Sequence, residues 1–73
     1  MPKFPRNVKQ NQAIRAFIRL GGVETYEGKG SHRRVLMPNG QKLTIPAGTL
    51  TIGMLSDAVK QAGVSVDEFI EAL

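Results

Sequence analysis

The chain has 73 residues, no cysteine, one histidine and a formal net charge of +4. This length predicts one small domain. The absence of cysteine excludes disulfides and thiolate chemistry. Because there is one histidine and the six acidic residues are scattered, we expect no metal site. No apolar run approaches the ~18 residues of a membrane span, and the first residues lack the apolar core of a signal peptide, so we expect a soluble, cytoplasmic protein.

Charge is distributed unevenly along the chain. Residues 1–42 carry nine Lys/Arg against two Glu, a balance of +7, whereas residues 43–73 carry one Lys against four acids, a balance of −3. A basic half of this kind attracts polyanions, of which nucleic acid is the most usual. The alternative is a solvated basic surface that serves only solubility.

The N-terminal part predicts an arm followed by a helix. Residues 1–6 hold two prolines and two cations and predict a flexible arm before a domain that spans residues 7–73. Asn7 or Asn11 can cap the helix, which ends at Gly21-Gly22. Its inward face is an apolar stripe at helical spacing: Ile14, Phe17 and Ile18.

Three strands are predicted next, at residues 23–27, 33–37 and 41–45. Pro38-Asn39-Gly40 joins the last two, and because proline has no N–H to bond across a two-residue turn, we expect a three-residue loop with a bulge at Gly40. Val35 then lies opposite Leu43 and Arg33 opposite Ile45. This register divides the hairpin into an apolar face (Val35, Met37, Leu43, Ile45) and a largely polar face (His32, Arg34, Leu36, Lys42, Thr44).

Two helices complete the chain. Thr49 or Thr51 can cap the first, whose apolar set is Leu50, Met54, Leu55, Ala58, Val59 and Ala62. Ser65 and Glu68 form a capping box for the second, with Phe69, Ile70 and Leu73 facing inward. The predicted fold is α+β: a three-stranded antiparallel sheet with helices packed on one face, in the order helix, three strands, helix, short helix.

The last two helices also have the glycine and small-residue spacing of a helix-turn-helix. The second of them, however, contains Asp67, Glu68 and Glu71 and no cation. DNA phosphates repel such a helix, so a tight helix–helix corner is the preferred interpretation and DNA reading the weaker one.

His32 is the residue best suited to acid–base chemistry, because the pKa of imidazole lies near working pH. Cutting RNA requires a base for the 2′-OH proton, cationic donors for the phosphorane and an acid for the 5′-oxygen. Lys29, Arg33, Arg34 and Lys42 can supply donors, and Gly30 allows close approach of a phosphate. A lone exposed histidine is more often an ordinary surface or RNA-contact residue, and spacing alone leaves both interpretations open.

A series of short motifs bears on the choice between a catalytic histidine and an ordinary surface residue. The motifs are Gly-Lys-Gly-Ser-His at 28–32, Pro-Asn-Gly at 38–40, Leu-Thr-Ile-Pro at 43–46, Gly-Thr-Leu at 48–50 and Lys-Gln-Ala-Gly at 60–63. With them the chain resembles the HicA (YcfA-like) mRNA interferase toxins over residues 11–73. The resemblance implies a fold like a double-stranded-RNA-binding domain and a metal-independent endoribonuclease without a cofactor. It implies His32 as the catalytic residue, RNA contacts from Lys29, Gly30, Ser31, Arg33, Arg34 and Lys42, and a HicB-type antitoxin that covers the histidine.

The chain departs from the family pattern at two places. Many members have a second histidine after the third strand, where this chain has Ala47, and an arginine before the glycine-rich loop, where it has Tyr26-Glu27.

The sequence as a whole leaves three hypotheses for the function: an RNA-cutting toxin, a non-catalytic RNA-binding module of the same fold, and a helix-turn-helix DNA-binding regulator.

Overall fold

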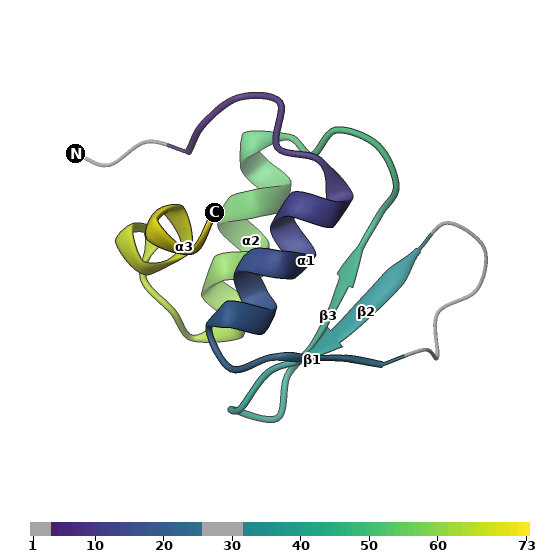
Figure 1. Cartoon of the computed structure of the whole chain (residues 1–73), viewed down its shortest axis with the longest axis vertical. Helices are drawn as coiled ribbons and strands as arrows, with labels where there is room; N and C mark the ends of the chain where they lie inside the picture. The colour runs from purple at the N-terminus through teal and green to yellow at the C-terminus, as the bar shows by residue number, and fades with distance from the viewer. Residues whose placement is uncertain (1–3, 26–31) are drawn as a thin grey trace.

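The computed structural model describes residues 4–25 and 32–73, and its six elements follow the predicted order (Figure 1). The elements are α1 (Gln10–Arg19), β1 (Val23–Thr25), β2 (Arg33–Leu36), β3 (Lys42–Ile45), α2 (Ile52–Ala62) and α3 (Val66–Ala72). The strands form one antiparallel sheet in the order β1-β2-β3, and the helices lie on one side of it. The predicted α+β fold is confirmed.

The β2–β3 hairpin has the predicted register. Val35 pairs with Leu43 and Arg33 with Ile45. The Gly40 N–H donates to the Met37 carbonyl at 2.9 Å, and the Met37 N–H donates to the Gln41 carbonyl at 2.8 Å. Gly40 has φ 87°, a conformation that glycine adopts without the steric cost of a side chain. The three-residue loop, which was predicted from the missing N–H of Pro38, is therefore present.

The start of α1 differs from the prediction. Neither Asn7 nor Asn11 caps it: the N-cap is Lys9, whose backbone N–H donates to Gln12 Oε1 at 2.9 Å. Asn7 instead takes φ 64° in the chain before the helix. The segment containing Lys9 is fixed by pairing with a distant part of the chain, and this tertiary contact overrides the local capping preference.

That pairing joins the N-terminal segment to the chain that follows β3. Lys9 forms an antiparallel bridge with Thr49. The Leu50 N–H donates to the Val8 carbonyl at 2.8 Å, and the Gln10 N–H donates to the Gly48 carbonyl at 3.2 Å. The segment before α1 is thereby held beside the segment that leads into α2.

The caps of the other two helices match the sequence. Thr51 is the N-cap of α2, and its Oγ1 accepts from the Met54 N–H at 3.1 Å. Ser65 caps α3, where Ser65 Oγ accepts from the Glu68 N–H at 3.1 Å and Glu68 Oε1 accepts from the Ser65 N–H at 3.0 Å. The reciprocal capping box predicted for α3 is present.

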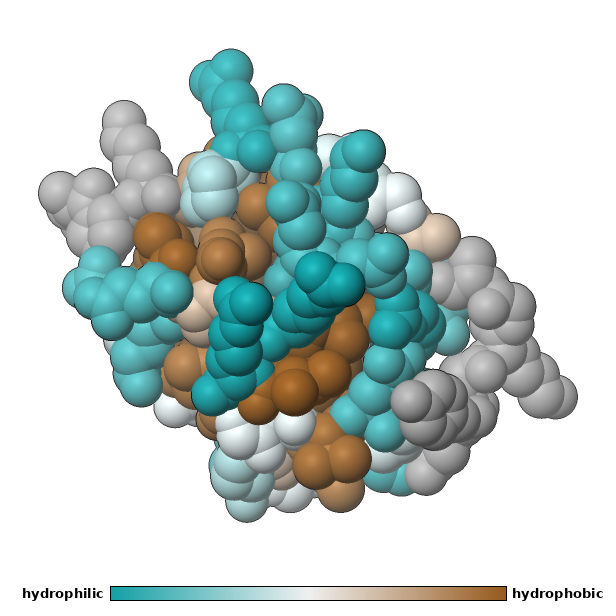
Figure 2. Space-filling view, in the orientation of Figure 1, coloured by the Kyte–Doolittle hydropathy of each residue, from teal (hydrophilic) through white to brown (hydrophobic). Residues whose placement is uncertain are grey.

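The core lies between the sheet and the helices. The hairpin contributes Val35, Met37, Leu43 and Ile45, and the helices contribute Phe17, Leu55, Val59 and Phe69, all buried. Three residues predicted to face inward do not: Ile18 is 43% exposed, Met54 47% and Leu73 37%. Ile18 and Met54 lie within α1 and α2, whereas Leu73 follows the last residue of α3. In Figure 2, hydrophilic side chains accordingly alternate with brown apolar surface on the side where α1 lies.

Candidate functional site

His32 directly precedes β2, and its side chain is exposed. The neighbouring candidates Lys29, Gly30 and Ser31 lie outside the described residues, as do Tyr26 and Glu27. The described part of the site is therefore His32 together with the surface of the sheet that β2 and β3 present.

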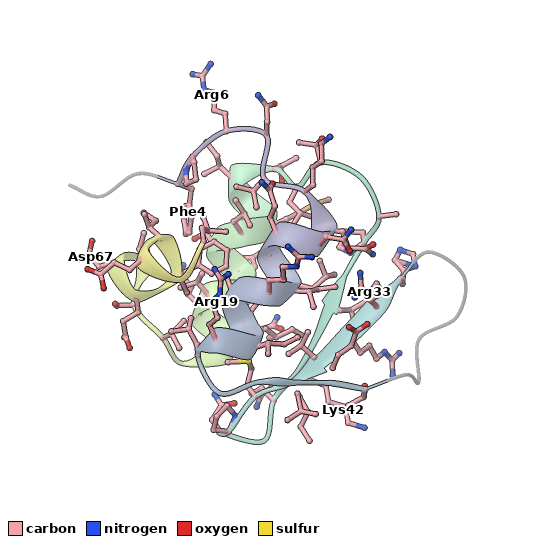
Figure 3. The ribbon with its side chains drawn as sticks, viewed as in Figure 1. Phe4, Arg6, Arg19, Arg33, Lys42 and Asp67 are labelled. Carbon is pink, nitrogen blue, oxygen red and sulfur yellow. The ribbon has the colours of Figure 1, made fainter. Side chains whose placement is uncertain are left out.

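Within residues 4–25 and 32–73, one face of the sheet carries no helix, and we refer to it as the open face. Arg34 pairs with Thr44 and Leu36 with Lys42, so these four side chains share that face, and all four are exposed. Figure 3 shows Lys42 directed away from the helices. The open face therefore brings two of the predicted phosphate donors, Arg34 and Lys42, onto one surface, and Arg34 lies two residues from His32 in the chain.

The open face also has an apolar part. Val23 of β1 pairs with Leu36 of β2, and the two are 64% and 37% exposed. Because Leu36 is also opposite Lys42, the row across the three strands is apolar at two positions and cationic at the third. Such a mixed row suits a protein partner as well as a polyanion.

Arg33 points to the other face of the sheet, toward α1 (Figure 3). Its Nε donates to Glu24 Oε2 at 2.7 Å and its NH2 donates to Glu24 Oε1 at 2.6 Å, which makes a bidentate ion pair. Its NH1 donates to Asn11 Oδ1. The Arg33 hydrogen bonds, with the attraction of its charge, hold the pKa of Glu24 below its usual value of 4.5 against the opposing effect of burial.

The structure thus separates Arg33 from Arg34 and Lys42. Its guanidinium links β2 to β1 and to α1. Glu24 and Asn11 were not among the sequence candidates. Glu24 could have been found from the register, since it pairs with Val35 and so stands diagonally across from Arg33 on the same face. Asn11 could not, because its approach depends on where α1 packs.

In residues 4–25 and 32–73, no group of three or more His, Cys, Asp or Glu side chains is placed to hold a metal ion. The exposed face of α3 presents Asp67, Glu68 and Glu71, which repel DNA phosphates. None of the helices in the described parts of the chain is long and apolar enough to cross a bilayer.

Comparison with known proteins was made for the whole chain. A search of curated proteins gives no match. The family model of the HicA toxin of bacterial toxin–antitoxin systems matches residues 11–64, about three quarters of the chain. This span includes α1 from its second residue, the whole sheet, His32 and α2. The chain belongs to the HicA toxin family of bacterial toxin–antitoxin systems.

Proposed function

We propose that this toxin is a metal-independent endoribonuclease that cuts mRNA, with His32 as general acid or base. The observation that carries the proposal is the exposure of His32 immediately before a strand whose open face presents Arg34 and, from the next strand, Lys42. Membership of a toxin family supports it, because a toxin needs an activity that can stop growth.

The chemistry requires few groups. A base removes the 2′-OH proton, the 2′-oxygen attacks the adjacent phosphorus, and an acid protonates the departing 5′-oxygen. Neutral imidazole can perform the first step and imidazolium the last. The pentacoordinate phosphorus gathers negative charge, which cationic donors stabilise. Arg34 and Lys42 are assigned this role, together with Lys29, Gly30 and Ser31, which precede His32 in the sequence.

Arg33 receives a different role in this proposal. Its guanidinium is engaged by Glu24 and Asn11 on the helix side of the sheet. It is therefore better suited to fixing the start of β2, and with it the backbone of His32, than to neutralising phosphate on the open face. Arg33 is a positioning residue in this scheme.

The partner of such a toxin is an antitoxin, and we propose one of the HicB kind. The exposed pair Val23 and Leu36 beside Lys42 offers both apolar area and charge to a protein. An acidic strand or loop that covered this row would also cover Arg34. Binding there would keep RNA from His32 and neutralise the toxin.

The test is induced expression of the wild type and of His32→Gln, with growth and mRNA integrity followed in both. Glutamine retains a hydrogen-bonding side chain but cannot exchange a proton near neutral pH. We expect growth arrest and mRNA loss from the wild type only, and cleavage by the purified wild type in the presence of EDTA.

Other outcomes would assign a different function. Growth arrest by both proteins without loss of mRNA would favour the non-catalytic RNA-binding module, in line with Ala47 at the position of the second family histidine. Cleavage of mRNA by His32→Gln at the wild-type rate would remove His32 from the chemistry.

A further inference from the structure

A hollow beside α1 is lined by three arginines and lies apart from the open face. It has a volume of about 330 Å³ and is formed where the N-terminal segment crosses α1. Arg6 comes from that segment, and Arg15 and Arg19 come from α1, four residues apart on one face of the helix. Asn7 and Gln12 add polar groups, and no Asp or Glu side chain is among the described residues that line it. Leu73, the last residue of the sequence, also lines the hollow, and its main-chain oxygen accepts from Arg19.

The three guanidinium groups differ in the hydrogen bonds that they make within the protein. Arg19 NH1 donates to the carbonyl oxygens of Ala72 at 2.6 Å and Leu73 at 3.4 Å, so this side chain is anchored to the end of α3. No hydrogen bond or ion pair joins the side chain of Arg6 or Arg15 to another described residue. Arginine has five N–H donors, so the hollow has unused donors from two side chains and more from the third.

This arrangement favours an anion. Like charges that face one hollow raise its positive potential, and the low-dielectric walls focus the field within it. The volume corresponds to roughly ten water molecules, more than one phosphate group fills and enough for a phosphate with part of its nucleotide. Planar guanidinium forks match the oxygen geometry of phosphate.

The hollow is connected to the candidate catalytic residue along α1. Asn11, Arg15 and Arg19 follow one another at four-residue intervals, which places Arg15 roughly 6 Å and Arg19 roughly 12 Å along the helix from Asn11. Asn11 is the residue that Arg33, next to His32, contacts. Figure 3 shows Arg33 on one side of α1 and Arg19 on the other, toward α3.

We infer that the hollow formed by Arg6, Arg15 and Arg19 binds a backbone phosphate of the RNA strand at a distance from the bond that is cut. The inference rests on the proposed function, since it takes RNA as the ligand. An RNA strand held at His32 continues past Asn11 onto α1, and a phosphate farther along it enters the hollow. This contact adds affinity for long RNA without taking part in the chemistry.

The experiment has two arms. In the first, inorganic phosphate is titrated into the isotopically labelled full chain, and amide resonances are followed by NMR. We expect shifts of Arg6, Asn7, Gln12 and Arg15. In the second, the affinity of a twelve-nucleotide single-stranded RNA is measured at several salt concentrations in a His32→Gln background, which prevents cleavage.

The decisive comparison in the second arm is between Arg15→Gln and Lys60→Gln. Both changes remove one exposed charge from a helix, but Lys60 is on α2 and does not line the hollow. We expect Arg15→Gln to weaken RNA binding roughly three- to tenfold and to lower the salt slope by about 0.7. Lys60→Gln should leave both within error of the parent.

Each contrary result has a separate meaning. Equal losses from Arg15→Gln and Lys60→Gln would show a bulk charge effect and overturn the inference while RNA binding itself stood. Phosphate shifts at the hollow with an unchanged RNA affinity for Arg15→Gln would leave a site for a free anion only, which also overturns it. Absence of RNA binding by every protein would contradict the proposed function first and the RNA role of the hollow with it.

Discussion

At the scale of single residues, the ion pair of Arg33 and Glu24 fixes the position of one of the predicted RNA-contact residues. The Arg33 side chain is 36% exposed and the Glu24 side chain 13%, and the pair has two hydrogen bonds. Two-pronged geometry of this kind is more ordered than a typical surface ion pair. The ion pair keeps Arg33 away from the open face, where Arg34 lies, and fixes the edge strand β1 to β2.

The pair predicts a coupling energy in a double-mutant cycle. Glu24→Gln and Arg33→Gln should each destabilise the fold, and the double variant should lose less than the sum of the two, with a coupling of roughly 1 kcal/mol. Denaturation in urea at neutral pH measures it. A coupling near zero would mean that water screens the pair in solution.

The same pair predicts a dependence of stability on pH. Because Arg33 lowers the pKa of folded Glu24 below 4.5, folding is favoured when this carboxylate is charged. The contribution is fully present above the unfolded value and is lost as pH falls through the lower folded value. The wild type should therefore lose more stability than Glu24→Gln between pH 5 and about pH 3. Parallel pH profiles for the two proteins would contradict the assignment.

Residue-scale prediction from sequence had a clear limit here. Neighbouring residues of a strand face opposite ways, so alternation along β2 could have separated Arg33 from Arg34, although both were predicted to contact RNA. The same alternation placed Arg34, Leu36, Lys42 and Thr44 on one exposed face, as found. It could not supply Asn11 as a partner, since that contact joins a helix and a strand 22 residues apart.

At the scale of elements, the chain between α1 and β1 has no space for a side chain at Gly22. A Cβ there would lie 2.7 Å from Val35 Cγ1, 2.8 Å from Met37 Sδ and 2.9 Å from the Phe17 carbonyl oxygen. The backbone oxygen cannot move without displacing α1. The close approach of this turn to the sheet therefore requires glycine.

Gly22→Ala should destabilise the fold by about 1–3 kcal/mol, because the added methyl forces the helix and sheet apart. Gly53→Ala is the matched control, since its Cβ would meet only Thr51 Oγ1 at 3.9 Å. In the helix α2 this control should be neutral or stabilising by up to about 1 kcal/mol. Urea denaturation of both variants provides the measurement, and equal effects would contradict the close packing at Gly22.

Element boundaries were predictable where the signal was local. The Pro38-Asn39-Gly40 turn and the Ser65–Glu68 capping box act within a few residues, and both are present as expected. The start of α1 depends on pairing between Lys9 and Thr49, 40 residues apart, and was missed. Met54 shows the same limit: its spacing fits the apolar stripe of α2, but the residue is 47% exposed, because burial depends on how α2 packs as well as on spacing.

At the scale of the whole molecule, α3 completes the core although it lies beyond the family match. Phe69 is fully buried, with its ring centre 4.9 Å from that of Phe17 and 5.9 Å from that of Phe4. One short helix therefore holds together the centre of α1 and the N-terminal segment. A small domain has few other aromatic contacts to compensate for its loss.

Phe69→Ala should cost about 3–5 kcal/mol, a large part of the roughly 4–11 kcal/mol expected for a domain of this length. We expect the variant to be mostly unfolded at 37 °C, as measured by circular dichroism and thermal denaturation. Phe69→Leu, which keeps most of the volume, should retain the fold. A variant Phe69→Ala with wild-type stability would show that α3 is dispensable.

The open face has a consequence for genetics. Because the sheet is covered on one side only, its bare side chains contribute little to folding, whereas the covered side contains the core. A selection for cells that survive the induced toxin should therefore return two separable classes of substitution. Changes on the covered side will lower the amount of protein, and changes on the bare side will leave abundance normal while toxicity is lost. Under the function proposed above, the surface that contacts RNA and antitoxin can thus change in sequence without a penalty in the amount of folded protein.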